Sequence, residues 1–360
     1  MKAALFYGGR DIRVETLPDP LPGPGEVLVR VRAAGICGSD LHGYRRPPPS
    51  PGQGGAPRGG APQGRENGHE LAGVVAAVGP GVSGLSVGQR VGVEPEHLIG
   101  CGDCQECRRG DSHLCATRGQ RDGARLGSHG FSEYDVCLAR NVHPLPDSVS
   151  EDAAAILDCY ACAVHALHRI PVTPDSTALV IGTGAIGMTL GQVLRAAGAR
   201  RVIMAGTRRA PLEIARAAGA ADEGIALSEG DPQGALLDLT AGRGADVVYE
   251  TVGGAAPTLE QAVSGAARGG SVCIMGIFGA PQPLDTAVAY RKELTITWSN
   301  SYSSWNGRSE YQIALDLLAA RRVRAEPLLT HHFPLERIAD AFAAADDKRA
   351  SGAVKVLVHA

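Results

Sequence analysis

The hydrophobic and polar positions of this chain follow one pattern up to about residue 150 and another from about residue 177. In the first part, short runs rich in β-branched residues, such as 26–31 and 71–78, are separated by glycine and proline. This pattern is typical of an irregular, barrel-like β domain. In the second part, the apolar strand predicted at 178–181 is followed by a helix predicted at 185–197. Apolar strands that alternate with helices predict a parallel sheet covered on both faces.

The alternating pattern continues to about residue 300 and predicts a doubly wound nucleotide-binding domain. The further strands predicted for its sheet are residues 201–205, 246–249, 271–277 and 294–298. After residue 300, we expect an amphipathic helix at 309–322, a second helix after Pro334 and a last strand at 354–358.

Length and charge narrow the class of protein. With 360 residues, the chain is too long for one ordinary hydrophobic core and is predicted to form two domains. The net charge of −3 argues against nucleic acid or an anionic membrane as a partner and favours small-molecule ligands. The N-terminal residues carry charges too early for a signal peptide, and the charge-free segment 177–194 contains four glycines, which argues against a membrane span. We therefore expect a cytoplasmic protein.

Four cysteines lie within fifteen residues, spaced as CxxCxxC and then seven residues to the last. They are Cys101, Cys104, Cys107 and Cys115. Four sulfur donors this close together can surround Zn²⁺ as a tetrahedron, so this segment is predicted to hold a closed, structural zinc ion. The alternative is a pair of disulfides, which the expected reducing compartment disfavours.

A second group of metal-binding residue types lies upstream and consists of Cys37 and the pair His69-Glu70. A catalytic zinc has three protein ligands and one open position, so a thiolate and an imidazole supply two thirds of such a site. Taken alone, either residue is more often structural, since single cysteines pack as small apolar residues and single histidines are usually hydrogen-bonded in the core.

A dinucleotide fingerprint occupies the start of the second part. The sequence Gly182-Thr183-Gly184-Ala185-Ile186-Gly187 follows a predicted strand and opens a predicted helix, which is the context that this motif requires. The next predicted strand ends in Gly206-Thr207-Arg208-Arg209, where a carboxylate would select NAD(H). A hydroxyl and two guanidinium groups favour the 2′-phosphate of NADP(H) instead, unless both arginines are only solvated surface charges. The candidate cofactor-binding residues are Gly182, Gly184, Ala185, Ile186, Gly187, Gly206, Thr207, Arg208, Arg209 and Gly276.

Cys37, the run GHELAGVVAAVG, the four-cysteine segment and the fingerprint occur in the order that resembles the zinc-containing alcohol dehydrogenases of the medium-chain dehydrogenase/reductase superfamily. The resemblance covers nearly the whole chain. It implies a GroES-like irregular β-barrel catalytic domain at residues 1–158, with the structural zinc lobe at 101–115. It also implies a Rossmann domain that binds NADP(H) at 159–299 and a return of residues 300–360 to the catalytic domain. The active site would then be a cleft between the two domains.

The resemblance also assigns roles within the site. Asp158 matches the position of the third ligand of the catalytic zinc, although Cys159 is a rival and Asp158 could instead cap the following helix. Glu70 would lie behind the metal, and Ser39 with His42 would pass the substrate proton to solvent. His42 could also be an ordinary surface histidine.

The function implied is hydride transfer between NADP(H) and a secondary alcohol, polyol, sugar or cyclitol, or the corresponding carbonyl compound. One alternative is a zinc-independent reductase of an activated C=C or C=N bond on the same scaffold. Another is a non-catalytic NADP-binding protein with structural zinc.

The proline- and glycine-rich residues 43–67 are either a lid at the substrate mouth or a solvated insertion. By resemblance we expect a homodimer or homotetramer, with the strand near Trp298 as an edge for pairing.

Overall fold

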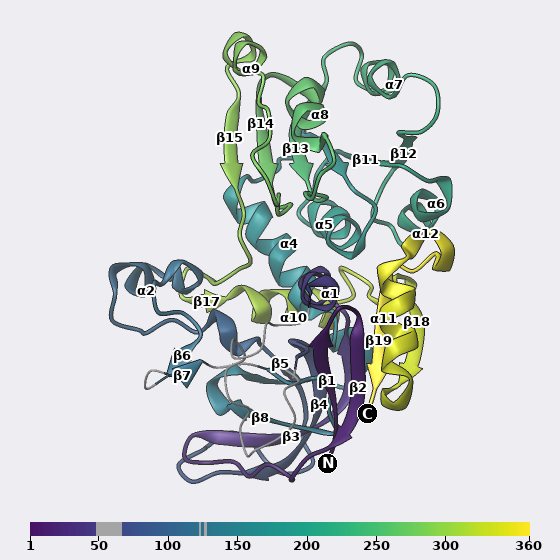
Figure 1. Cartoon of the computed structure of the whole chain (residues 1–360). Helices are drawn as coiled ribbons and strands as arrows, with labels where there is room; N and C mark the ends of the chain where they lie inside the picture. Colours follow the sequence, from purple (N-terminus) through teal and green to yellow (C-terminus); the bar gives the residue numbers. More distant parts are fainter. Residues whose placement is uncertain (48–66, 122–123, 126–127) are drawn as a thin grey trace. The chain divides into compact units, whose positions relative to one another are not determined.

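The computed structural model describes residues 1–47, 67–121, 124–125 and 128–360 of the chain (Figure 1). These residues form two compact units, of which the first comprises Met1–Asp158 and Leu329–Ala360 and the second comprises Cys159–Leu328. Most of the proline- and glycine-rich segment lies outside the described residues, so its two interpretations stay predictions. None of the helices in the described part of the chain is long and apolar enough to cross a membrane.

The first unit is built on a mostly antiparallel seven-stranded sheet, with strands in the order β18-β19-β3-β4-β5-β9 and with β8 paired to β3. The strands are β3 (Glu26–Gly35), β4 (Glu70–Val78), β5 (Arg90–Val93), β8 (Tyr134–Leu138), β9 (Val142–Pro144), β18 (Leu329–Pro334) and β19 (Lys355–His359). Along β3, the side chains of Val27, Val29 and Val31 are buried, whereas the arginines that alternate with them are not. This period of two places one face of the strand in the core and the other outside.

Short elements complete the first unit. The hairpin strands β1 (Lys2–Gly8) and β2 (Asp11–Thr16) pair with each other. The helices are α1 (Gly38–Arg45), α2 (Gln105–Arg109), α3 (Glu151–Ala154), α11 (Ile338–Asp346) and α12 (Lys348–Ser351). The 3₁₀ turns are η2 (Glu96–Leu98), η3 (Ser112–Leu114), η4 (Ala139–Asn141) and η6 (Leu335–Arg337). Two strands of two residues each, β6 (Gln120–Arg121) and β7 (Ala124–Arg125), pair with each other. Helix α11 packs beside β18 and β19 (Figure 1), and Phe342 on this helix lies edge-to-face against Phe6 and Phe131 in the core.

The second unit contains a parallel six-stranded sheet with the strand order β12-β11-β10-β13-β14-β15. Its strands are β10 (Thr177–Ile181), β11 (Arg201–Gly206), β12 (Glu223–Ala226), β13 (Ala245–Glu250), β14 (Ala266–Ile274) and β15 (Thr295–Trp298), and Figure 1 shows β13, β14 and β15 side by side. The order runs outward in opposite directions from β10 and β13. Because crossovers between parallel strands are right-handed, the helices of the two halves cover opposite faces. The parallel, doubly wound sheet predicted from the sequence is therefore confirmed.

The helices of this unit are α4 (Leu157–Arg169), whose first two residues belong to the first unit, α5 (Ala185–Ala196), α6 (Arg209–Ala217), α7 (Pro232–Leu239), α8 (Thr258–Gly265), α9 (Thr286–Lys292) and α10 (Glu310–Ala319). The unit also contains the 3₁₀ turn η5 (Glu326–Leu328) and the small hairpin of β16 (Ser304–Trp305) and β17 (Arg308–Ser309). Every residue of the central strand β10 is buried, which explains the unbroken apolar run at residues 178–181.

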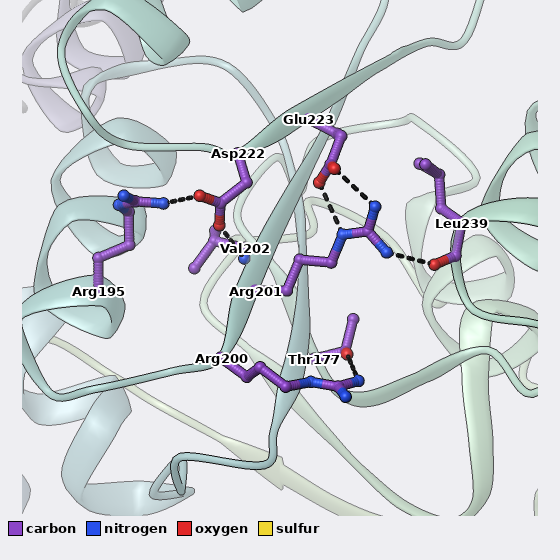
Figure 2. A network of polar contacts seen from close by, with 8 residues as sticks. All are labelled: Thr177, Arg195, Arg200, Arg201, Val202, Asp222, Glu223 and Leu239. Atoms are coloured by element: carbon purple, nitrogen blue, oxygen red, sulfur yellow. Dashed lines mark hydrogen bonds and ion pairs between the residues drawn. The ribbon is translucent and has the colours of Figure 1, made fainter.

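A network of arginines fixes the amino ends of three neighbouring strands (Figure 2). Arg201, at the start of β11, donates two hydrogen bonds of 2.8 and 2.6 Å to Glu223 of β12 and one of 2.5 Å to the carbonyl of Leu239. Asp222 accepts a 2.7 Å bond from the amide of Val202 and pairs with Arg195 of α5. The charges therefore gather at the amino edge of the sheet, and the carboxyl edge is left for ligand-binding loops.

Residues 300–328 lie in the second unit, whereas the sequence-based interpretation placed the return to the first domain at residue 300. The physical reason is a buried contact. Glu310 of α10 accepts hydrogen bonds of 2.8 Å from His165 and 2.7 Å from His168, both on α4. The hydroxyl of Tyr160, also on α4, donates a 2.9 Å bond to the carbonyl of Arg324. These bonds tie the segment to α4, and the chain re-enters the first unit only at Leu329.

Candidate functional site

Four potential metal ligands converge in the first unit. One donor atom each from Cys37, His69, Glu70 and Asp158 lies within 4.8 Å of the other three. Cys37 directly precedes α1, His69 directly precedes β4, Glu70 is the first residue of β4, and Asp158 lies in the first turn of α4. The structure thus brings together all three residues predicted to bind the catalytic zinc and adds Glu70 to the group.

The pairing of β3 with β4 explains this convergence. Gly35 at the end of β3 is opposite Glu70 at the start of β4, so the residues just beyond the pair, Cys37 and His69, come close together. Asp40 then fixes both residues. One of its carboxylate oxygens accepts a 2.8 Å hydrogen bond from the amide of Cys37, and the other lies 3.6 Å from Nδ1 of His69. Asp40 is 1% exposed, so its carboxylate acts within the protein interior and holds Cys37 and His69 in place.

The surroundings of His69 favour positive charge. Burial alone would lower the pKa of its imidazole, but Asp40 and Cys37 together raise this pKa well above its ordinary value. Negative groups that favour the protonated imidazole also attract a metal cation, and a bound cation would compete with protons for this ring.

Glu70 is held by a partner that the sequence did not indicate. The ammonium group of Lys355, on β19, forms an ion pair with the Glu70 carboxylate and donates a 3.1 Å hydrogen bond to the carbonyl of Ile36. Both side chains of the ion pair are almost fully buried. A Cβ atom at Gly35 would overlap the Glu70 carboxylate, so glycine is required there for close packing. The only sequence signal for Lys355 is a lysine within the otherwise apolar run 353–358.

Ser39 and His42 lie on α1, three residues apart, and both are exposed. Residues with this spacing share one face of a helix, so the two side chains predicted to carry the proton project from the same side of α1. The sequence interpretation did not single out His97. Its ring lies edge-to-face against the ring of His69, with 5.2 Å between the centroids.

The four cysteines predicted to hold the structural zinc also converge, with all four sulfur atoms within 4.8 Å of one another. All nine cysteines are free, so the disulfide alternative is not what the structure shows. Amide-to-sulfur hydrogen bonds of 3.4 Å run from Cys101 to Cys115, from Cys104 to Cys101 and from Cys107 to Cys104. Hydrogen bonds to its sulfur, above all with the side chain of Thr117, lower the pKa of Cys115 to about 6. Such bonds stabilise thiolates, which is the form that binds metal.

The predicted fingerprint forms the turn between β10 and α5 in the second unit. Gly182 has a φ of 120°, which only glycine adopts readily, and Gly184 is the N-cap of α5. A Cβ atom at Gly187 would overlap the carbonyl of Gly182, so glycine allows the helix to start close against the turn. Ala185 and Ile186 form the first turn of α5. The amide groups at this helix start point outward and suit the pyrophosphate of a dinucleotide.

The residues expected to recognise the ribose lie at the end of β11. Gly206 is the last residue of the strand, Thr207 follows, and Arg208 is the N-cap of α6. Arg209 is engaged by Glu229, since its Nε lies 2.8 and 2.9 Å from the two carboxylate oxygens. Sequence reasoning had not singled out Glu229.

Gly276 follows β14. A Cβ atom at this glycine would overlap the carboxylate of Glu250 and the amide of Gly253. Glu250 is fully buried and accepts 2.8 Å bonds from the amides of Val252 and Gly253. Gly276 therefore packs against the loop that leaves the carboxyl end of β13, beside the point where the strand order reverses.

Comparisons with known proteins agree with both units. Residues 23–147 match the alcohol dehydrogenase GroES-like domain, and residues 185–320 match the zinc-binding dehydrogenase family. The chain is 33% identical to sorbitol dehydrogenase from Bacillus subtilis, over 95% of this chain and 92% of the relative. It is 34% identical to L-threonine 3-dehydrogenase from Saccharopolyspora erythraea, over 92% of this chain and 91% of the relative.

A solved structure of an alcohol dehydrogenase from Escherichia coli with the cofactor NADH covers 100% of this chain and 99% of its own, with 30% identity and a TM-score of 0.84. The matches span both units, the GroES-like region and the parallel sheet. The chain belongs to the zinc-containing alcohol dehydrogenase family of the medium-chain dehydrogenase/reductase superfamily.

Proposed function

We propose that this protein is a zinc-dependent dehydrogenase that transfers a hydride between NADP(H) and a secondary alcohol, polyol, sugar or cyclitol, or the corresponding carbonyl compound. The observation that carries the proposal is the convergence of Cys37, His69, Glu70 and Asp158 within 4.8 Å. The sequence and its family resemblance predict three of these residues, Cys37, His69 and Asp158, as the zinc ligands.

The donor set fits zinc. A thiolate, an imidazole and a carboxylate are the ligands that Zn²⁺ takes in proteins, and three protein ligands leave one coordination position open. We assign these three roles to Cys37, His69 and Asp158. Glu70 is assigned a supporting role, because its charge is already balanced by the buried ammonium group of Lys355. The four cysteines of the other cluster form a closed, structural set.

Zinc in such a site supplies Lewis acidity toward an alcohol or carbonyl oxygen, and the nicotinamide supplies or accepts the hydride. The protein positions these groups and moves the proton. Asp40 orients Cys37 and His69 through its two carboxylate oxygens. We assign the transfer of the hydroxyl proton to Ser39 and its passage to solvent to the exposed His42.

The preference for NADP(H) rests on the end of β11. The segment 206–209 contains no carboxylate to bind a ribose 2′-hydroxyl, whereas Thr207 and Arg208 offer donors for a 2′-phosphate. Glu229 competes for Arg209, so Glu229→Gln should release this guanidinium group and raise the ratio of kcat/KM for NADPH over NADH. Arg208→Ala should lower the same ratio. Equal ratios in the original protein and both variants, or a preference for NADH, would contradict this assignment.

The related proteins support the substrate class. Their names refer to sorbitol, L-threonine and (R,R)-butanediol, and each of these compounds carries a secondary hydroxyl group. A solved zinc-binding dehydrogenase from Sinorhizobium meliloti bound to NADP is 27% identical over 100% of this chain and 99% of its own, with a TM-score of 0.83.

We further propose a homo-oligomer that pairs through β15, the edge strand that ends at the exposed Trp298.

The deciding experiment measures zinc content and turnover together, with a panel of polyols and carbonyl compounds. Replacing Cys37 by alanine should remove one zinc ion per chain and reduce turnover at least about a hundredfold, because several kcal/mol of charge stabilisation are lost. Cys162→Ala, which changes a cysteine outside both clusters, is the matched control. Full turnover of the Cys37→Ala protein would refute the proposed function.

A further inference from the structure

A third cluster of metal-binding side chains lies in the first unit, separate from the two cysteine-containing clusters. It consists of Asp152, His332 and His359, with one donor atom of each residue within 4.8 Å of the others. Asp152 belongs to α3, whereas His332 and His359 belong to the neighbouring strands β18 and β19. None of the three has a role in the proposed reaction.

The backbone brings the two histidines together. In the parallel pair of β18 and β19, His332 is opposite Leu357, so His359 lies two residues further along the neighbouring strand. Residues two apart on a strand share a face of the sheet, so both imidazoles lie on the same side. Their rings are stacked, with 5.3 Å between centroids and an interplanar angle of 3°.

Both rings are directed at one carboxylate. Nε2 of His359 lies 2.9 Å from one carboxylate oxygen of Asp152, and Nδ1 of His332 lies 3.7 Å from the other. The first distance is that of a hydrogen bond, and the second is too long for one. Two imidazole nitrogens and a carboxylate therefore converge on one volume with only one short bond between them.

We propose that Asp152, His332 and His359 form a third metal site that binds a divalent cation, with Zn²⁺ as the preferred ion. Two nitrogen donors and one carboxylate oxygen suit borderline metals such as zinc. With bonds of about 2.0–2.2 Å to a common ion, tetrahedral donors lie about 3.4 Å apart, so small side-chain adjustments close the site. The side chains are 38%, 44% and 35% exposed, respectively, so water completes the coordination and the ion exchanges with solvent.

Such an ion would link α3 to the strand pair β18 and β19. These elements are distant in the sequence, and α3 also packs against β3, β4 and β5. A metal that binds the folded arrangement and not the unfolded chain stabilises the fold. The site is therefore structural, and its occupancy depends on the free zinc concentration.

The test compares zinc binding by the full-length protein and its variants at equilibrium. Equilibrium dialysis against Zn²⁺, followed by elemental analysis, should show one zinc ion fewer per chain in His332→Gln and in Asp152→Asn than in the original protein. His331→Gln, which changes the adjacent residue of β18, is the matched control and should retain the full amount. Added Zn²⁺ should also raise the melting temperature of the original protein and of His331→Gln, but less in the other two variants.

Circular dichroism spectra verify that each variant is folded. Equal zinc content in the original protein and His332→Gln would overturn the proposal, because the imidazole would then have no part in binding. Retention of the ion in Asp152→Asn would overturn it as well, since the carboxylate is the group on which both rings converge. Loss of an ion in His331→Gln would show that the effect is not specific to this cluster.

Discussion

The buried ion pair between Lys355 and Glu70 offers a quantitative test of how the candidate zinc site is supported. The Lys355 side chain is 2% exposed and the Glu70 side chain is 0% exposed. Lys355→Met keeps most of the volume of the lysine stem but removes the ammonium group. The Glu70 carboxylate then stays buried without this counter-ion.

The expected loss of stability in Lys355→Met follows from the burial of both charged groups. Removing one partner of a buried ion pair costs about 3–5 kcal/mol, because a charge remains in a region of low dielectric constant. An exposed pair contributes at most about 1 kcal/mol, so the burial of both groups decides between the two estimates. We expect Lys355→Met to lower the free energy of unfolding of the first unit by about 3–5 kcal/mol. Adding Glu70→Gln should recover most of this loss, since the uncompensated charge is then absent.

Equilibrium urea denaturation followed by circular dichroism, at a fixed zinc concentration, measures these differences. Hydrogen exchange should show that the loss of protection is centred on β3, β4 and β19. Lys2→Met is the matched control, because both side chains of the ion pair between Lys2 and Glu336 are about half exposed. Its loss should lower the free energy of unfolding by at most about 1 kcal/mol. If Lys355→Met behaves like Lys2→Met, or if the double variant is no more stable than the single one, the reasoning is wrong.

Three further predictions concern other parts of the chain. Gly187→Ala should abolish binding of NADPH, measured by fluorescence titration, because the new Cβ overlaps the turn before α5. Burial opposes ionisation of Glu310, but hydrogen bonds from His165 and His168 lower its pKa to about 2. The carboxylate therefore stabilises the fold at pH values above the pKa that Glu310 has in the unfolded chain. About 3 kcal/mol should be lost as pH falls from about 4.5 to about 2, and Glu310→Gln should remove this dependence in acid titrations of stability. Cys115→Ser should reduce zinc content by one ion per chain and lower the melting temperature, because thiolate ligands hold structural zinc.

Much of the fold could be predicted because its signals are local. The predicted strand at 178–181 is β10 apart from its first residue, and the predicted helix at 185–197 is α5 with one residue fewer. Strand β18 was not predicted. Its sequence LTHHFP alternates poorly and its residues are only partly buried, since it lies at the edge of the sheet. A strand that buries little apolar surface leaves little periodicity in the sequence.

The return of the chain to the first unit at Leu329 could not be read from the sequence for a different reason. The residues that hold α10 in the second unit, His165 and His168, precede Glu310 by 145 and 142 positions. Local patterning predicts a helix near residue 310 but contains nothing about the element against which that helix packs. Only the three-dimensional pairing assigns the helix to a unit.

Local sequence patterns also do not show which partners the charged residues near the ligand sites have. The sequence and its family resemblance predict Glu70 behind the catalytic metal and Arg209 near a 2′-phosphate. The structure shows that each is paired with an opposite charge, Lys355 and Glu229 respectively. The two pairs differ in consequence. The Lys355 pair is buried, so Glu70 adds no net charge to the group of donors, and the negative charges of Cys37 and Asp158 alone would balance a divalent ion. The Arg209 pair is exposed and therefore weak, so a 2′-phosphate can compete for the guanidinium group. Burial, which no local motif encodes, thus determines which of these charges remains available to a ligand.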